Sequence, residues 1–395
     1  MEEQSENKEE KKWNSKIWTK WNNRRKERSK TGSRTKIKTG KLDANASSEA
    51  GEYPFFTCSK EPLRISTYSY DCECVLVAGN GDLNVKYYNG KFDAYQRTYI
   101  IEDDSDGKLF MPYLYYFMEG YVEELRKQAI GGVIKYIKLG NLTDAMIELP
   151  DVEIQKEIVD ILSKTKGVLD SRNRQIDMLD NLIKARFVEM FGDEKNLMVM
   201  SDICSIITDG THQPPKFKSE GIPFIFVSNI TGDRVTYEAE KYIDQDTYDE
   251  LIKRTPIEIG DVLLSTVGSY GHPAVVKSDK KFLFQRHIAY LKPRKELIDS
   301  DYLHGAILSP DAQRQIESGV KGIAQKTLNL SEIKKMTIPV PPLNRQKEFS
   351  YFVAQVDKSK VVVQKAFDET QMLYDSLLQE YFDWGDVIYD KIRQT

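Results

Sequence analysis

Cysteine and histidine are the residues of this chain with the chemistry to hold a metal ion or act as nucleophiles. Cys72 and Cys74 flank Glu73 and have no second pair at zinc-ligand spacing, which favours packing within a strand. Cysteines without a paired framework are typical of a reducing compartment, so we expect a cytoplasmic protein. The histidines form no ligand-spaced cluster, which favours turn, surface or packing roles for His212, His272, His287 and His304.

Two glycine loops and two Pro-Pro strings are the other candidates for catalytic chemistry. The loops at 79–81 and 268–271 follow strand-like segments but lack the spacing that cradles a phosphate. The strings at 213–216 (QPPK) and 340–343 (VPPL) lack the acid or amide and the aromatic residue that a DNA adenine methyltransferase places around two prolines. A nuclease-like string at 150–153 (PDVE) loses both acids in the second half of the chain. We therefore expect no catalytic residue, metal or cofactor.

Charge is distributed unevenly along the 395 residues, whose formal net charge is −4. Residues 1–41 hold 14 Lys/Arg and 6 Asp/Glu, while the remainder holds 43 Lys/Arg and 55 Asp/Glu. An acidic body argues against nonspecific affinity for nucleic acid, so any such contact must use local patches or basic partners. The first dozen residues are polar and no run of 18 apolar residues occurs, so we expect neither a secretory signal nor a membrane helix.

The second half of the chain repeats the first, most clearly where a strand-like segment runs into a helix. Residues 147–152 (IELPDV), followed by Gln155, correspond to residues 338–343 (IPVPPL), followed by Gln346, 191 positions later. The same offset continues without a gap to the phenylalanine at the end of each helix. So long a period excludes a solenoid of small repeats and indicates one domain-plus-helix unit present twice.

Each repeat ends in a helix with a coiled-coil pattern. Steps of four and three from Ile158 and from Phe349 give five heptads of mostly apolar residues without an internal proline. Thr165 and Arg172 of the first series stand where the second has valine, so we interpret the helices as mutual partners. At ~1.5 Å per residue, each helix of about 38 residues is roughly 55–60 Å long. The alternative is two unrelated amphipathic helices on separate cores.

The segments before the helices, about 37–149 and 197–340, both resemble short strands joined by glycine or asparagine turns. Each also contains a helical stretch, near 112–125 and 301–318. The two segments are related but differ in length, since Gly40 corresponds to a glycine 170 positions later. Two further matches have an offset of 189: residues 96–97 (QR) with 285–286 (QR), and Tyr113 with Tyr302.

The order of variable domain, Pro-containing strand and long helix, present twice, resembles the specificity subunit of type I restriction-modification enzymes. Residues 338–343 with Gln346 match that family's signature at the start of its conserved helix. The resemblance covers about residues 37–382. Other segments resemble the openings, central strand and glycine loop of its target-recognition domains: 39–45 (TGKLDAN), 53–57 (YPFFT), 209–212 (DGTH), 221–225 (GIPFI), 260–264 (GDVLL) and 268–271 (GSYG).

The resemblance implies an α/β (α+β) fold, with two similar target-recognition domains joined by two long antiparallel coiled-coil helices as a pseudo-two-fold internal repeat. Glu27 and Ser33 stand where the second domain has an apolar lead-in, so we expect a basic, flexible arm at the N-terminus. The predicted parts are the arm at 1–36, recognition domains at 37–152 and 194–343, conserved helices at 153–193 and 344–384, and a tail at 385–395.

The resemblance also implies a non-catalytic subunit that reads a bipartite, asymmetric target in double-stranded DNA. Its partners would be two methyltransferase subunits, docked on the repeated helices, and restriction or translocase subunits. The helix pair would hold the domains about one DNA turn (~34 Å) apart, so that helix length sets the unread spacer. Two alternatives are a stand-alone DNA-modifying enzyme and a coiled-coil scaffold that binds proteins and no DNA.

Such domains place loops in the major groove, where each base pair shows a distinct donor and acceptor pattern. Arg97 and Arg286 suit guanine, whereas Asn80, Gln96 and Gln285 suit adenine. Each could instead contact a phosphate or be a plain surface residue. The candidates are polar, planar or cationic residues beside glycine turns. In the first domain they are Lys41, Asn45, Lys60, Asn80, Lys86, Tyr88, Gln96 and Arg97, and in the second Thr211, His212, Lys216, Lys218, Asn229, Ser269, Tyr270, His272, Gln285 and Arg286.

Overall fold

The computed structural model describes residues 27–322 and 325–382. The predicted arm as far as residue 26 and the predicted tail at 385–395 lie outside the described residues. Over the described ranges, no helix is long and apolar enough to cross a membrane.

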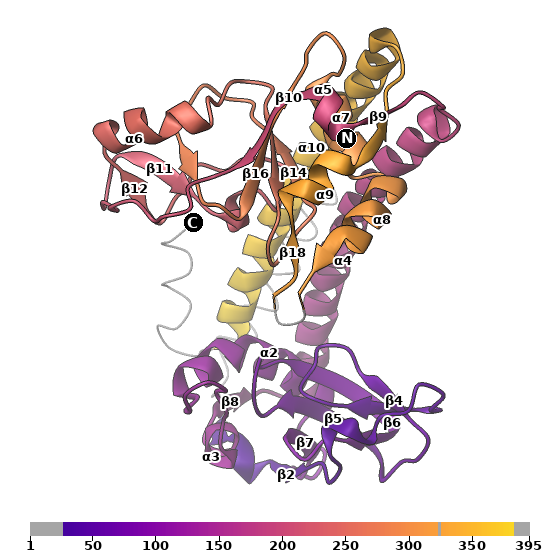
Figure 1. Cartoon of the computed structure of the whole chain (residues 1–395). Helices are drawn as coiled ribbons and strands as arrows, with labels where there is room; N and C mark the ends of the chain where they lie inside the picture. Colours follow the sequence, from indigo (N-terminus) through magenta and orange to yellow (C-terminus); the bar gives the residue numbers. More distant parts are fainter. Residues whose placement is uncertain (1–26, 323–324, 383–395) are drawn as a thin grey trace, which may run out of the picture. The chain divides into compact units, whose positions relative to one another are not determined.

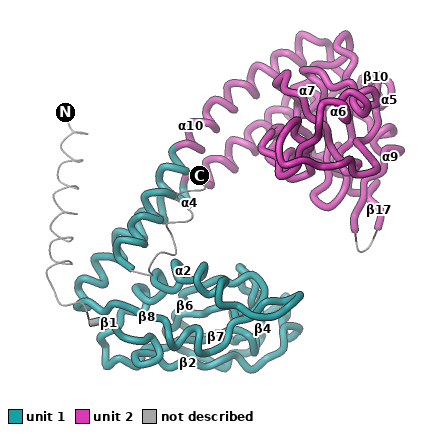
Figure 2. The backbone as a smooth tube through the Cα atoms, turned by 90° about the vertical axis from the view of Figure 1, so that its left-hand side faces the viewer, with its two compact units in different colours: residues 1–171, 366–395 teal, residues 172–365 magenta. Residues whose placement is uncertain are grey.

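The chain divides into two compact units, residues 1–171 with 366–395 and residues 172–365 (Figure 2). Each unit combines one globular domain with parts of both long helices, α4 (Val152–Phe191) and α10 (Leu343–Tyr381). The fold class predicted from the sequence is therefore confirmed: two similar α/β domains and two long, antiparallel helices.

A six-stranded sheet forms the first domain, in the order β2-β7-β5-β6-β3-β4 (Figure 1). All neighbouring strands are antiparallel except β3 and β6. Helix α2 packs on this sheet, and its apolar face forms one core with the first half of α4 and the end of α10. The elements are β1 (Glu27–Lys30), η1 (Thr31–Ser33), β2 (Thr35–Thr39), η2 (Ala44–Ala46), β3 (Tyr53–Phe56), β4 (Leu63–Ile65), β5 (Tyr70–Ala78), β6 (Val85–Ala94), β7 (Thr98–Asp103), α2 (Met111–Gln128), α3 (Leu139–Thr143) and β8 (Met146–Leu149).

The second domain has a related but longer series of elements around two smaller sheets, β10-β16-β13-β14 and β12-β11-β15. Its core joins α7, α8 and α9 to the end of α4 and the start of α10. The elements are β9 (Leu197–Val199), α5 (Met200–Ile203), β10 (Cys204–Asp209), β11 (Ile222–Ile225), η3 (Val227–Asn229), β12 (Tyr242–Ile243), α6 (Gln245–Leu251), η4 (Ile252–Arg254), β13 (Val262–Ser265), β14 (Pro273–Val275), β15 (Leu283–Phe284), β16 (Ile288–Pro293), α7 (Ser300–Ile307), α8 (Pro310–Gly319), β17 (Val320–Lys321), β18 (Thr327–Leu328), α9 (Leu330–Lys335) and β19 (Thr337–Pro339).

One strand accounts for the difference between the sheets. In the first domain β6 pairs with β5 along one part and in parallel with β3 at its end, so the sheet is continuous. In the second domain β14 pairs with β13, and β15 pairs in parallel with β11. The charged stretch 277–281 (KSDKK) separates these two short strands. A run of four charged residues in five is poorly suited to a buried strand, which explains the interruption.

The coiled-coil seam predicted from the sequence is present. Every position of the four-three series beginning at Ile158 in α4 and at Phe349 in α10 is buried or half-buried. In the second unit Phe187, near the end of α4, packs against Phe349 at the start of α10, with ring centroids 5.4 Å apart. Asp180 forms an ion pair with Lys360 at 2.5 Å. Late residues of one helix thus contact early residues of the other, which makes the pair antiparallel.

The prediction of a flexible arm through residue 36 is wrong for residues 27–36. β1 pairs antiparallel with β8, as β9 pairs with β19 in the second domain. Thr31 is fully buried, and its backbone N–H donates to the Ala145 carbonyl at 2.9 Å. This segment is held by backbone pairing and by a buried threonine. Neither requires apolar residues at regular spacing, so the sequence lacks the apolar pattern of the second domain.

The helix expected near 301–318 is two helices, α7 and α8, that meet at Ser309. The Ser309 hydroxyl accepts the backbone N–H of Ala312 at 3.3 Å, so it caps α8. Pro310 is the first residue of α8, where its missing N–H has no helical partner to lose. The Ser-Pro pair therefore ends one helix and begins the next.

Candidate nucleic-acid interface

A buried glutamine fixes the junction between the first domain and α4. The Gln155 side chain has no exposed surface, and its carbonyl accepts the backbone N–H of Phe110 at 2.8 Å. Its NH₂ group donates to the carbonyls of Lys108 at 2.7 Å and Pro150 at 2.8 Å. The loop before α2 and the turn before α4 are thereby tied to one side chain.

Gln346, 191 positions later, does the same at the start of α10. Its side chain is fully buried and accepts the backbone N–H of Asp299 at 2.8 Å. It donates to the carbonyls of Leu297 at 3.0 Å and Pro341 at 2.7 Å. The glutamine of the repeated motif is therefore a structural residue that holds each domain on its helix.

The far ends of the helices are exchanged between the domains. Phe382, which follows α10, packs on Tyr113 of the first domain with ring centroids 4.9 Å apart, and Phe191 of α4 packs on Tyr302 of the second at 5.0 Å. Both tyrosine hydroxyls donate to a backbone carbonyl of the strand before the helix, β8 at 2.9 Å and β19 at 2.7 Å. Each domain is closed by the start of one helix and the end of the other.

The loops that carry most first-domain candidates are tied together by backbone hydrogen bonds. The N–H of Gly79, after β5, donates to the Arg97 carbonyl at 2.8 Å, and that of Gly40, after β2, donates to the Thr98 carbonyl at 3.0 Å. The Asn84 side chain also donates to a carbonyl of the loop after β3 at 2.8 Å. These bonds bring together the loops at 40–46, 57–60, 79–84 and 95–97.

The starts of β7 and β16 show that the loops before them correspond at an offset one residue longer than the 189 inferred from the sequence. β7 begins at Thr98 and β16 at Ile288, and the carbonyl of each accepts an N–H from the glycine that follows β2 or β10, at 3.0 and 3.2 Å. The offset in space is therefore 190. Residues 96–97 (QR) correspond to 286–287 (RH) and not to 285–286 (QR), because the repeated dipeptide is displaced along an otherwise equivalent turn.

Six first-domain candidates lie on the connected loops. Asn80 is half-buried, while Lys41, Asn45, Lys60, Gln96 and Arg97 are exposed. The Gln96 amide donates to the Asp43 carboxylate at 3.2 Å, which orients it within its own loop pair.

The other two first-domain candidates lie within β6 and have partners there. Lys86 is half-buried and donates to the Asn84 side chain, and burial lowers the pKa of its ammonium group. Tyr88 packs on Phe56 and Phe92, with centroids 5.1 and 5.7 Å apart. These contacts favour structural roles for both residues.

A charged cluster lies beside the first loop of the second domain. Asp209 accepts from Arg254 of η4 and lies 2.9 Å from His212 Nε2. Arg254 and His212 remain more than half exposed, whereas the Asp209 side chain is 15% exposed. The carboxylate thus orients a guanidinium and an imidazole toward a groove of about 500 Å³, which Lys216 and Lys253 also line.

Several remaining candidates use their polar groups within the domain. Asn229 accepts the backbone N–H of Phe226 at 3.0 Å and donates to Thr236 at 3.2 Å, so it closes its own loop. The Tyr270 hydroxyl donates to Glu317 at 2.7 Å. Lys218 lies 3.7 Å from Asp244 in an exposed ion pair.

Thr211, Gln285 and Arg286 form the second-domain counterpart of the connected loops. Thr211 and Gln285 make an isolated parallel bridge, and the N–H of Arg286 donates to the Thr211 carbonyl at 3.1 Å. Arg286 is exposed and its Nε lies 3.4 Å from the His287 ring, whose pKa is lowered by burial and by this positive charge. Ser269 is exposed on the loop after β13.

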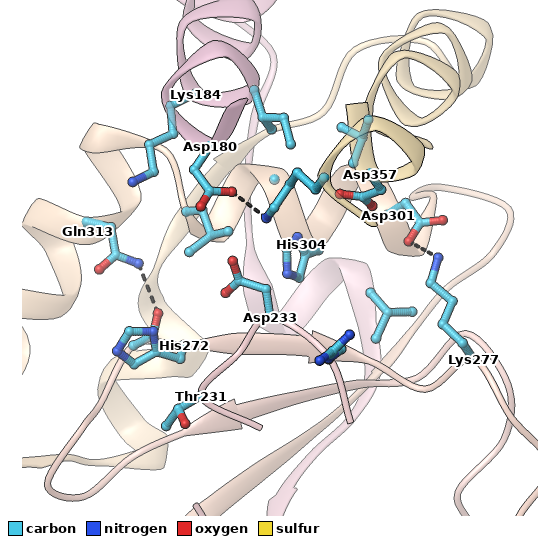
Figure 3. A pocket seen from close by; sticks show the side chains of 18 residues that line it. Asp180, Lys184, Thr231, Asp233, His272, Lys277, Asp301, His304, Gln313 and Asp357 are labelled. Atoms are coloured by element: carbon cyan, nitrogen blue, oxygen red, sulfur yellow. Dashed lines mark hydrogen bonds and ion pairs between the residues drawn. The ribbon is translucent and has the colours of Figure 1, made fainter. Parts of the chain in front are cut away.

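His272 lines a cavity of about 540 Å³ within the second unit (Figure 3). The cavity lies between the domain and parts of α4 and α10. His304 points into it from α7, beside Asp233, and its Nε2 is buried without a hydrogen-bond partner. Burial lowers the pKa of His304 more than the nearby aspartates raise it. This pocket is part of the domain–helix junction.

Sequence reasoning missed Arg254, Lys253 and Lys135. Arg254 and Lys253 lie more than 35 residues beyond the first loop and reach it only because α6 and η4 fold back. Lys135 lies on a hairpin hydrogen-bonded to the loop at residue 81. No periodic pattern or motif in the sequence marks these three residues, so only the tertiary structure could identify them.

The cysteines and histidines form no metal-binding cluster in the part of the chain that the structure describes. No group of three or more His, Cys, Asp or Glu side chains there could hold a metal ion. Cys74 is fully buried in β5, and burial raises the pKa of its thiol far above the usual range. The expectation that the Cys72–Cys74 pair packs within a strand is confirmed.

Comparison with known proteins gives the same family that the sequence motifs indicated. The domain described as "Type I restriction modification DNA specificity domain" matches residues 27–179 and 194–366. The Escherichia coli type I restriction enzyme EcoDI specificity subunit is 36% identical over 153 residues, 39% of this chain and 34% of that protein. The EcoBI specificity subunit of the same organism is 23% identical over 349 residues, 78% of this chain and 73% of that protein.

Solved structures agree in fold. The S subunit of a type I restriction-modification system from M. genitalium has a TM-score of 0.52 at 16% identity, covering 91% of this chain and 97% of that one. Neither alternative, a stand-alone modifying enzyme or a scaffold without DNA binding, has support in these comparisons. Because two copies of the specificity domain match more than half of the residues, the chain belongs to the type I restriction-modification DNA specificity family.

Proposed function

We propose that this chain reads a bipartite, asymmetric sequence in double-stranded DNA and directs methyltransferase and restriction subunits to it, without catalysing a reaction itself. It would act in the cytoplasm. One observation carries the proposal: equivalent backbone turns in the two domains, fixed at an offset of 190, hold different side chains. Different side chains on the same frame would read different bases.

The exposed residues of the connected loops supply the chemistry. Arg97 and Arg286 are exposed guanidinium groups that suit the two major-groove acceptors of guanine. Gln96 suits adenine in the first half-site, and the cluster of His212 and Arg254 supplies donors in the second. These patches are local, as an acidic body requires.

The long helices support partner docking. Both carry exposed apolar residues away from the seam, including Tyr351 at 70%, Val362 at 68% and Met178 at 60% exposure in the second unit and Met372 at 68% in the first. Apolar side chains in such numbers on a helix surface are typical of a protein interface. Since the helices repeat, two similar sites would suit two copies of one methyltransferase.

The proposal is tested by expressing the chain with its methyltransferase subunit and sequencing the methylated DNA. We expect one bipartite motif with different halves. Arg97→Ala should relax or weaken only one half and Arg286→Ala only the other, each by about 1–3 kcal/mol of discrimination. Methylation at unrelated sites, or by the chain alone, would contradict the assignment.

Helix length is tested separately. A heptad inserted into both α4 and α10 between the two units, after residues 171 and 365, preserves the seam and adds about 10 Å. We expect both half-sites to survive with a spacer about three base pairs longer, since B-DNA rises ~3.4 Å per base pair. An unchanged spacer would show that the helix pair does not set the distance.

A further inference from the structure

An exposed apolar hairpin lies at residues 130–136 of the first domain, and apart from Lys135 its residues belong to no group proposed above. Val133 is fully exposed, Ile134 is 62% exposed and Ile130 is 42% exposed. All seven residues of the hairpin are exposed, and Ile137 directly after it is buried. Contiguous aliphatic side chains in solvent indicate an interaction site.

The hairpin has a defined geometry. Ile130 and Tyr136 exchange backbone hydrogen bonds of 3.0 and 2.9 Å, which close it. Gly131 has a φ of +119°, and a Cβ there would lie 2.5 Å from the Ile134 carbonyl oxygen. The turn that presents the aliphatic tip therefore requires glycine at this position.

The hairpin continues the connected loops of the first domain. The N–H of Gly81 donates to the Lys135 carbonyl at 3.0 Å, and the N–H of Ile137 donates to the Gly79 carbonyl at 2.9 Å. Gly79 in turn donates to the Arg97 carbonyl at 2.8 Å. Two successive backbone hydrogen bonds, from Ile137 to Gly79 and from Gly79 to Arg97, therefore connect the base of the hairpin to the arginine proposed to read guanine.

The second domain repeats this attachment. Gly268 donates to the Lys326 carbonyl at 3.4 Å, Leu328 donates to the Thr266 carbonyl at 2.8 Å, and Thr266 donates to the His287 carbonyl at 2.9 Å. β17 and β18 form the stem of this second hairpin (Figure 2). Lys135 and Lys326 occupy equivalent positions, 191 residues apart, so each hairpin places a lysine beside the connected loops of its domain.

We propose that the hairpin at 130–136 is a DNA-contacting element that places Val133 and Ile134 against a base step beside the first half-site, with Lys135 on a neighbouring phosphate. The inference rests on the proposed function. Aliphatic wedges that partly unstack a base step are an established way for a protein to hold and bend DNA. Three lysines in or beside the hairpin, Lys127, Lys135 and Lys138, are exposed and suit a polyanion better than an apolar protein surface.

The test uses the full chain assembled with its methyltransferase subunits and a duplex bearing the target, with 2-aminopurine at steps beside the first half-site. We expect the unaltered complex to increase the 2-aminopurine fluorescence, and Val133→Ser/Ile134→Ser should abolish this increase and weaken DNA binding about tenfold. Leu63→Ser/Met146→Ser, which replaces two other exposed apolar residues of the same domain, should change neither. Lys135→Ala should reduce the slope of log affinity against log salt by about one.

Each other outcome is informative. Loss of complex assembly by the serine pair, with DNA binding unchanged in what assembles, would assign the hairpin to a protein partner and overturn the proposal. Unchanged affinity and fluorescence would overturn it as well. Failure of the unaltered complex to bind any DNA would instead refute the proposed function, so the two failures are distinguishable.

Discussion

The two units of this chain are most alike where each domain joins the helices and least alike where its loops meet. At the junctions Gln155 and Gln346 make the same three hydrogen bonds, and Tyr113 and Tyr302 the same two contacts. At the loops the backbone bonds persist while the side chains change. A recognition surface can therefore diverge without loss of fold, because its turns are held by main-chain hydrogen bonds.

The exchange of helix ends explains why the junctions stay alike. Phe382 closes the first domain and Phe191 the second, so each helix carries residues that both domains need. A change at a helix end affects a domain far away in sequence. Loop residues such as Lys41 or Ser269 do not complete the core of a domain in this way.

The largest expected effect comes from the exchanged phenylalanines. Phe382→Ala should destabilise the first domain by about 3–5 kcal/mol, because the substitution would leave a cavity in the core that contains α2 and β5. Phe191→Ala should do the same to the second domain. Hydrogen exchange of α2 and of α7 would report the two domains separately. The comparison would be broken if Phe382→Ala loosened α7 and left α2 protected.

A smaller effect is expected from the junction glutamines. Gln155→Ala and Gln346→Ala each leave buried backbone groups without partners and should cost about 2–4 kcal/mol of stability in their own unit. The control is Gln355→Ala on the exposed face of α10, which should change stability by less than about 0.5 kcal/mol. Denaturant unfolding followed by hydrogen exchange would measure both. Equal losses of stability in the two units would support two junctions of the same design.

The loop comparison predicts changes in specificity with little change in stability. Asn229→Ala removes hydrogen bonds that close its own loop, so it should lower stability by about 1 kcal/mol. Arg286→Ala removes an exposed side chain and should leave the thermal midpoint within a degree or two while altering the methylated sequence. Melting curves and methylation sequencing of the two variants distinguish a loop-closing residue from a reading residue. Loss of stability in Arg286→Ala, with an altered methylated sequence in Asn229→Ala, would mean that the two residues have the opposite roles.

The smallest expected effect is a pH dependence confined to the second unit. The folded-state pKa of His304 lies below the unfolded value near 6.5, because burial disfavours the imidazolium. Unfolded chains therefore take up the proton first, so stability is complete above about pH 6.5 and falls as the pH decreases toward the folded pKa. Between pH 7.5 and 5.5 we expect a loss of about 1 kcal/mol or less, absent in His304→Gln. An identical pH profile for the variant would exclude His304 as the source.

Much of this organisation was predictable because it rests on local sequence periodicity. The heptads from Ile158 and Phe349 predict the seam, since an apolar stripe at that period must face a partner. The Pro-containing motif with its glutamine locates the strand-to-helix junctions. Of the candidate readers, Arg97, Arg286 and Gln96 are exposed. By contrast, Lys86, Tyr88 and Asn229 are half-buried and have internal partners. Sequence cannot separate these groups, because both are polar residues beside turns.

The sequence by itself determined that the chain is a duplicated domain-plus-helix unit of a known family, because repeats and heptads are properties of residue order. Tertiary structure decided how the repeats are completed. It placed the polar segment at 27–36 in a strand pair, moved the loop correspondence from 189 to 190, and closed each domain with the far end of the other helix. These features depend on backbone hydrogen bonds and on contacts between distant residues, which leave no period in the chain.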